Sequence, residues 1–184
     1  SNIKKTTKPI IVIASHARSL STIFFRTLMN NTQIIPFFEP FIRYRFNQDI
    51  AKIENYPYQN REDFIKYLES MIAQAEKEDK FLLIKDMADI PKEYFIDVIS
   101  KIAETRPVKY VYLARQPKAA YSSLLRKLRS EKKATEEIVD ALKALPIYQS
   151  LWEMYENHKG KVVIAEDLQE EPNRIIKELY EYIG

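Results

Sequence analysis

Apolar residues along the chain fall into two alternating patterns, short continuous runs and longer segments with helical spacing. The short runs are rich in β-branched and aromatic residues, which is typical of strands covered on both faces of a sheet. They predict strands at Ile10–Ala14, Phe81–Ile84, Tyr110–Leu113 and Val162–Ala165, with a weaker candidate at Ile34–Phe38.

The segments between these runs carry apolar residues three and four positions apart, as amphipathic helices do. These positions are Phe64, Tyr67, Leu68, Met71 and Ile72; Tyr94, Phe95, Val98, Ile99 and Ile102; Leu142, Leu145, Leu151, Trp152 and Tyr155; and Ile175, Ile176, Leu179, Tyr180 and Ile183. Pro91, Pro117 and Pro172 stand where first helical turns should begin, a position that tolerates proline. The alternation predicts an α/β three-layer sandwich, with a mainly parallel sheet of about five strands flanked by helices.

Composition narrows the class of protein. The chain has 184 residues, of which 46% are hydrophobic and 30% charged, and no stretch rich in proline, glycine or serine divides it, so we expect one domain over residues 1–184. It has no cysteine and two histidines, so neither disulfides nor a structural metal is expected. A net charge of +3 suits anionic ligands but not a nucleic-acid partner. No apolar run reaches the roughly 20 residues of a membrane span, so we expect a soluble, cytoplasmic protein.

The segment after the first predicted strand combines hydroxyls with a cation. It is Ser15-His16-Ala17-Arg18-Ser19-Leu20-Ser21-Thr22, and it leads into a helix through Ile23, Phe24, Leu28 and Met29. Ligands of parallel sheets bind at the carboxyl ends of strands, and helix-start amides, hydroxyls and a guanidinium together suit a phosphate. The alternative is that Ser21 and Thr22 only cap the helix while Arg18 is a solvated charge. The glycine-rich loop Gly-x-x-x-x-Gly-Lys-Ser/Thr is absent, which counts against an ordinary kinase or nucleotide triphosphatase.

This loop resembles that of the bacterial sulfotransferase family, which has a P-loop-type α/β fold. The family usually has proline before the basic residue, where this chain has Ala17. Further segments resemble the family in the same order along nearly the whole chain. They are Phe37-Phe38-Glu39-Pro40-Phe41, Ile84-Lys85-Asp86-Met87-Ala88, Tyr110-Val111-Tyr112-Leu113-Ala114-Arg115-Gln116-Pro117-Lys118 and Val162-Val163-Ile164-Ala165-Glu166-Asp167-Leu168.

The resemblance implies a donor, 3′-phosphoadenosine 5′-phosphosulfate (PAPS), and residues that bind it. The loop would hold the 5′-phosphosulfate end through Arg18, Ser19, Leu20, Ser21 and Thr22. Arg115 and Ser123, with Ser122 as the alternative serine, would hold the 3′-phosphate, for which a planar guanidinium is well suited. The structural alternative is a salt bridge for Arg115 and a solvent-facing serine.

The resemblance also implies catalytic candidates. Lys85 would lie at a strand tip facing the donor's leaving phosphate, and its alternative is a lysine that merely ends a strand and reaches water. Glu39 is the first candidate for the general base, and its alternatives are pairing with Arg43 or capping the helix after Pro40. His16 is the second candidate base because it lies beside the anion loop and titrates near neutrality.

These features predict an enzyme that transfers a sulfuryl group from PAPS to a hydroxyl or amine of a small-molecule or carbohydrate acceptor. No metal is expected, because the family needs none and its Glu-Asp-Leu segment, here Glu166 and Asp167, is largely structural. The alternatives are a non-catalytic nucleotide-binding or interaction domain on this scaffold, and a P-loop-like kinase or phosphohydrolase. Relatives continue past the helix that ends at Gly184, so we expect a C-terminally truncated domain or one without a covering loop.

Overall fold

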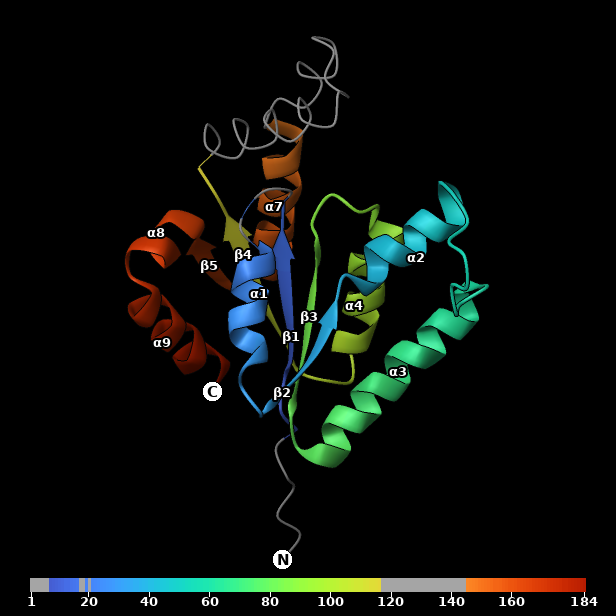
Figure 1. Ribbon diagram of the computed structural model, residues 1–184, viewed down its shortest axis with the longest axis horizontal. Helices are drawn as coiled ribbons and strands as arrows, with labels where there is room; N and C mark the ends of the chain where they lie inside the picture. The colour runs from blue at the N-terminus through green and yellow to red at the C-terminus, as the bar shows by residue number, and fades with distance from the viewer. Residues whose placement is uncertain (1–6, 17–18, 20, 117–144) are drawn as a thin grey trace, which may run out of the picture. The chain divides into compact units, whose positions relative to one another are not determined.

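The computed structural model describes residues 7–16, 19, 21–116 and 145–184 (Figure 1). Within them, five strands form one sheet in the order β2-β3-β1-β4-β5. The strands are β1 Ile10–Ser15, β2 Ile34–Phe38, β3 Phe81–Met87, β4 Val108–Ala114 and β5 Lys161–Ile164. β2 pairs in parallel with β3, with Phe38 opposite Lys85, and β4 pairs in parallel with β5, with Ala114 opposite Ile164. Helices flank the sheet, so the predicted α/β class is confirmed.

Helices follow the strands in the alternation that the apolar pattern predicts. They are α1 Ser21–Met29, α2 Pro40–Asp49, α3 Arg61–Glu78, α4 Ile96–Ala103, α7 Leu145–His158, α8 Ala165–Glu170 and α9 Pro172–Ile183, with a 3-10 turn, η1, at Lys92–Tyr94. Pro172 occupies the first turn of α9 as predicted. Pro91 instead precedes η1, and α4 begins later, at Ile96. Pro117 and Leu142 lie outside the described residues.

The described chain divides into two compact units. The first comprises the chain up to Val12 with residues 26–86 and 90–109, and the second comprises residues 13–25, 87–89 and 110–184. The prediction of a single domain over residues 1–184 stays a prediction.

In the first unit, α3 buries one apolar face. Its buried residues are Phe64, Leu68, Ile72 and Ala75, which recur at helical spacing. The Phe64 ring stacks on Tyr44 of α2 at 4.5 Å and meets the edge of Phe41 at 5.4 Å. Burial of one such side chain stabilises the fold by about 1.5–3 kcal/mol. Asn60 caps the start of α3 by accepting a hydrogen bond from the Asp63 amide at 2.9 Å. These contacts order α2 and α3 within the first unit.

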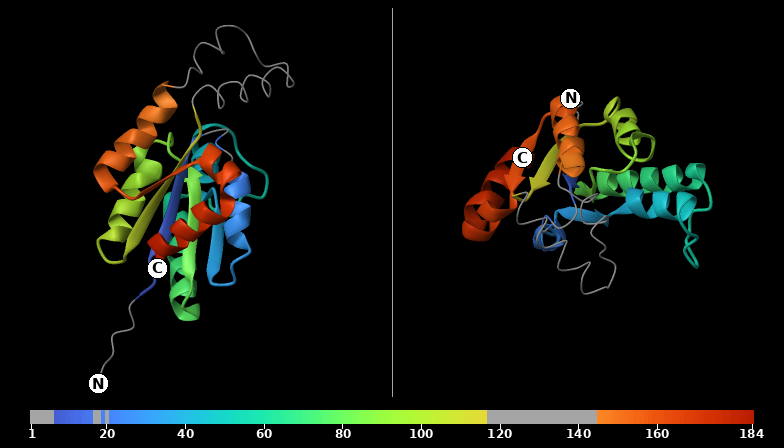
Figure 2. Two further views of the ribbon diagram at one scale, coloured as in Figure 1. Left: turned by 90° about the vertical axis from the view of Figure 1, so that its left-hand side faces the viewer. Right: turned by 90° about the horizontal axis from the view of Figure 1, so that it is seen from above.

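In the second unit, β5 is followed by two helices. α8 and α9, the red helices of Figure 2, follow β5 directly and pack beside it. α9 turns Ile175, Leu179 and Ile183 inward. The turn before β5 requires glycine, because Gly160 has φ 134° and the Tyr110 carbonyl occupies the space that a Cβ would need. This packing orders β4 and β5, whose carboxyl ends carry Arg115 and Glu166.

Candidate functional site

The strand–loop–helix segment after β1 lies in the second unit and is largely buried. Ser15, His16 and Ser19 have exposed fractions of 0%, 1% and 0%. α1 then begins at Ser21, which is also buried, whereas Thr22 is exposed on the first turn. The predicted helix is present, and it begins at Ser21, so that the last two residues of the predicted loop, Ser21 and Thr22, belong to its first turn. Arg18 and Leu20, two of the predicted donor-binding residues, lie outside the described residues.

Ser19 has a feature that ordinary packing does not explain. Its Oγ atom is buried and has no hydrogen-bond partner within the described part of the chain. A buried hydroxyl without a partner costs about 1–3 kcal/mol, so native structures rarely keep one without reason. Ser19 lies two positions before the first residue of α1, a nine-residue helix whose first turn contains no acidic residue. The first amides of a helix and its positive end favour an anion at this place.

Arg115 directly follows β4 in the same unit and is held by its backbone. Its amide donates a hydrogen bond to His16 Nε2 at 3.0 Å, and its carbonyl accepts one from the Tyr148 hydroxyl. Arg115 Nε lies 3.9 Å from Glu166 Oε1, and the side chains of this pair are 18% and 23% exposed. The structure thus brings together His16 and Arg115, two predicted site residues that are 99 positions apart in the sequence. Ser123 and Ser122, its predicted companions, lie outside the described residues.

Glu39 and Lys85 form an ion pair in the first unit. Lys85 Nζ lies 2.7 Å from Glu39 Oε1, and the side chains are 2% and 23% exposed. The Glu39 amide also donates to the Lys85 carbonyl at 2.7 Å, which continues the pairing of β2 with β3. Lys85 Nζ lies 5.1 Å from the centroid of the Phe38 ring, within the range of a cation–π contact. Lys85 therefore does not reach water from a strand end. It is buried with a carboxylate partner.

The backbone of Glu39 is strained. Glu39 has φ 50° and ψ 47°, a left-handed conformation that costs a residue with a Cβ roughly 1–2 kcal/mol. Its side chain does not cap α2, so that structural alternative is wrong. Strained residues of this kind cluster at functional sites, where surrounding contacts hold them. Here the contacts are the two hydrogen bonds to Lys85.

Asp86 supplies the cap that Glu39 does not. This carboxylate is fully buried, and it accepts hydrogen bonds from the amides of Phe41 at 2.7 Å and Ile42 at 3.3 Å. It therefore satisfies the open amides at the start of α2 from a neighbouring strand. Sequence reasoning missed this role because the partners are 45 positions away and the usual cap position holds Glu39.

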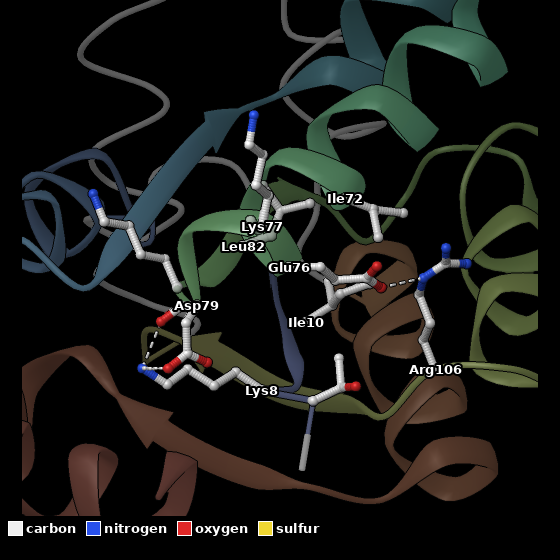
Figure 3. A pocket seen from close by; sticks show the side chains of 11 residues that line it. Lys8, Ile10, Ile72, Glu76, Lys77, Asp79, Leu82 and Arg106 are labelled. Atoms are coloured by element: carbon white, nitrogen blue, oxygen red, sulfur yellow. Dashed lines mark hydrogen bonds and ion pairs between the residues drawn. The ribbon is translucent and has the colours of Figure 1, made fainter. Parts of the chain in front are cut away.

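Three pockets are formed within single units. One lies beside Ile10 and Leu82, at the amino ends of β1 and β3 and thus at the opposite end of β3 from Lys85 (Figure 3). Figure 3 shows Glu76 facing Arg106 across a 2.7 Å ion pair and Lys8 facing Asp79. This pocket is small, about 130 Å³, and these charges pair with one another. A second pocket lies between α3 and α4 and measures about 370 Å³.

The third pocket is a groove of about 760 Å³ between α7 and the strands β4 and β5, in the second unit. It is lined by four aromatic residues, Tyr112, Tyr148, Trp152 and Tyr155, together with Ala114, Gln149, Leu151 and Val162. Trp152 and Tyr155 thus line a groove.

The comparisons with known proteins concern the fold. No family model and no curated protein sequence matches the chain. Solved structures do. The sulfotransferase domain of the Synechococcus PCC 7002 olefin synthase matches with a TM-score of 0.60 and 18% identity, over 99% of this chain and 75% of that one. The sulfotransferase from Alicyclobacillus acidocaldarius matches with a TM-score of 0.63 and 14% identity, over 96% and 81%. The chain has a sulfotransferase-like P-loop fold.

Two further solved structures, one of a sulfotransferase and one of a sugar kinase, also match the fold. Mouse sulfotransferase SULT7A1 complexed with PAP matches with a TM-score of 0.62 and 13% identity, over 96% of this chain and 59% of that one. PAP is PAPS without the sulfuryl group. A sugar kinase from Janibacter sp. HTCC2649 matches with a TM-score of 0.52 and 15% identity, over 96% and 94%. The TM-scores of these matches show a shared fold, and the identities of 13–18% do not show a shared reaction. The reaction must therefore be inferred from the residues of the site.

Two further observations concern metals and membranes. Within the described ranges, no three histidine, cysteine or acidic side chains gather as the ligands of a metal ion would. Among the helices that the structure describes, none combines the length and the apolarity that crossing a membrane requires.

Proposed function

We propose that the chain transfers a sulfuryl group from PAPS to a hydroxyl or amine of a small-molecule or carbohydrate acceptor. The observation that carries this proposal is the buried hydroxyl of Ser19, which has no hydrogen-bond partner within the described residues and lies two positions before α1. An anion at the start of α1 would supply the acceptor atom that this hydroxyl needs. The sulfotransferase-like fold makes a phosphosulfate the anion of choice.

Donor binding is assigned to two groups of residues. Arg18, Ser19, Leu20, Ser21 and Thr22 hold the 5′-phosphosulfate end through hydroxyls, amides and one guanidinium. Arg115 and Ser123 hold the 3′-phosphate. The burial of Ser19 and Ser21 and the fixed backbone of Arg115 support this assignment.

Catalysis is assigned to charge stabilisation and proton transfer. By analogy with phosphoryl transfer, Lys85 and Arg18 stabilise negative charge on the leaving phosphate. Glu39 takes the proton of the acceptor as the new bond from acceptor to sulfur forms and the bond from sulfur to the bridging oxygen breaks. The strained backbone of Glu39 and its ion pair with Lys85 support a functional role for both. His16 stays the alternative base, although its Nε2 lone pair already accepts the Arg115 amide.

Replacing Ser19 by alanine tests the donor loop. We expect the affinity for PAP to fall about 10- to 100-fold, because a hydrogen bond to a charged group contributes about 1.5–3 kcal/mol. The unliganded variant should be as stable as the wild type or more so, because it no longer buries a hydroxyl without a partner. Calorimetric titration and thermal unfolding measure the two effects.

Thr32→Ala, which removes an exposed hydroxyl, is the matched control and should change neither quantity. Unchanged PAP affinity in Ser19→Ala would contradict the assignment of this loop to the donor. A large loss of stability without ligand would show instead that Ser19 has a structural role.

A phosphoryl-transferring enzyme is the second candidate, favoured by the match to a sugar kinase. The missing glycine-rich loop argues against it, because such loops surround nucleotide phosphates with backbone amides. Magnesium-dependent turnover of ATP by the chain would favour this candidate over sulfuryl transfer. A non-catalytic nucleotide-binding domain would bind PAP but transfer no sulfuryl group.

A further inference from the structure

The backbone amide and the backbone carbonyl of Arg115 are both hydrogen-bonded to aromatic side chains. The residue stands one position past β4, where a chain leaves the hydrogen bonding of its sheet. His16, from the segment after β1, accepts the Arg115 amide at 3.0 Å, and Tyr148, from α7, donates its hydroxyl to the Arg115 carbonyl. Two separate elements of the second unit therefore hold this one peptide position.

The two aromatic side chains also fix each other. The His16 and Tyr148 rings have centroids 4.7 Å apart and are tilted by 48°, and His16 is 1% exposed. Burial raises the pKa of Tyr148 to about 12, assisted by the negative charge of Glu166 and opposed by Arg115. The phenol therefore stays protonated near neutral pH and remains a donor to the Arg115 carbonyl.

Glu166 contacts both Arg115 and the residue that follows it, Gln116. Its Oε1 atom accepts the Gln116 amide at 2.9 Å and lies 3.9 Å from Arg115 Nε. The contact with Nε is longer than a hydrogen bond, so it orients the guanidinium electrostatically and is not the bidentate pairing that arginine makes with an anion. The carboxylate thus acts on both the backbone and the side chain at the end of β4.

We infer that Tyr148, His16 and Glu166 are positioning residues that fix Arg115 for the 3′-phosphate and thereby set the selectivity for 3′-phosphorylated nucleotides. The inference rests on the proposed function, which assigns Arg115 to that phosphate. A planar guanidinium pairs with two phosphate oxygens only in a narrow range of orientations, so a shift of its backbone weakens the contact. Tyr148 is the sharpest probe, because one hydroxyl carries its contact with Arg115.

Tyr148→Phe keeps the ring against His16 and removes only the hydroxyl. Selectivity is measured here as the dissociation constant for adenosine 5′-monophosphate (AMP) divided by that for PAP. We expect this ratio to fall about tenfold, because Arg115 without the Tyr148 hydroxyl is less well oriented for its charged contact with the 3′-phosphate. The affinity for AMP, which lacks the 3′-phosphate, should not change. Titration calorimetry of wild type and variant with both nucleotides measures the ratio.

Two further variants make the test specific. Tyr155→Phe, on the same helix and lining the same groove, packs against Tyr112 and should leave the ratio unchanged. Glu166→Gln keeps an acceptor for the Gln116 amide but loses the charge beside Arg115, so it should lower the ratio without lowering the melting temperature.

The outcomes separate this inference from the proposed function. A wild-type chain that prefers PAP, together with a Tyr148→Phe variant of equal preference, would overturn the inference and leave the proposed function standing. Equal loss of AMP and PAP binding in the variant would also overturn it, because that result indicates a general structural role. A wild-type chain without any preference for PAP would overturn the proposed function and the inference together.

Discussion

Replacing Glu39 by glutamine is expected to lower the rate of sulfuryl transfer by about 10²- to 10⁴-fold, the usual contribution of a general base. The amide cannot take a proton from the acceptor, but its oxygen can still accept the hydrogen bond from Lys85 that Glu39 accepts at 2.7 Å. The affinity for PAP should therefore stay unchanged. The rate is measured as sulfuryl transfer from PAPS, at saturating donor, to an acceptor that the wild type uses.

Glu54→Gln is the control for Glu39→Gln, since Glu54 is exposed in the same unit. It removes one carboxylate of the same kind and should retain the wild-type rate. If Glu39→Gln also retains that rate, Glu39 is not the base. A corresponding loss in a His16 variant that still binds PAP would then assign the proton transfer to His16.

Asp86→Ala is expected to lower the free energy of unfolding by about 2–4 kcal/mol, because it removes a helix cap and leaves two backbone amides without an acceptor. The amides are those of Phe41 and Ile42, and Asp86 itself is fully buried. Asp86→Asn keeps one acceptor oxygen and should lose less. Denaturant unfolding, with the midpoint and slope fitted together, measures both differences.

Asp89→Ala provides the comparison for Asp86→Ala, because Asp89 is an exposed carboxylate three positions further along the chain. Its stability should match the wild type. Equal stabilities for the Asp86 and Asp89 variants would mean that the α2 cap contributes nothing, which contradicts the structural role assigned to Asp86.

The sheet could be predicted because continuous apolar runs mark strands buried on both faces. β2 has the predicted bounds, Ile34–Phe38, and β1 is one residue longer than predicted. β4 is three residues longer than predicted, at Val108–Ala114, and β3 also continues three residues beyond Ile84, to Met87. Lys85 and Asp86 break the apolar pattern there, and both are nevertheless buried, since each has partners of complementary charge or polarity.

The candidate site was predictable only in part. The position of functional residues after strands follows from the geometry of parallel sheets, and it selects the loop after β1, Glu39 and Arg115. The left-handed backbone of Glu39 has no sequence signal, because that conformation usually favours glycine or asparagine. The contact of Tyr148 with Arg115 joins positions 33 residues apart, and the helical spacing of α7 does not reveal it.

The most direct test of the central claim is a calorimetric titration of the unmodified chain with PAP, AMP and ATP in separate experiments. The proposed donor site predicts that PAP binds saturably and at least about tenfold more tightly than AMP, because PAP makes one additional charged contact through its 3′-phosphate. ATP, which also lacks the 3′-phosphate, should bind more weakly than PAP. The absence of saturable PAP binding, or equal affinities for the three nucleotides, would contradict the account.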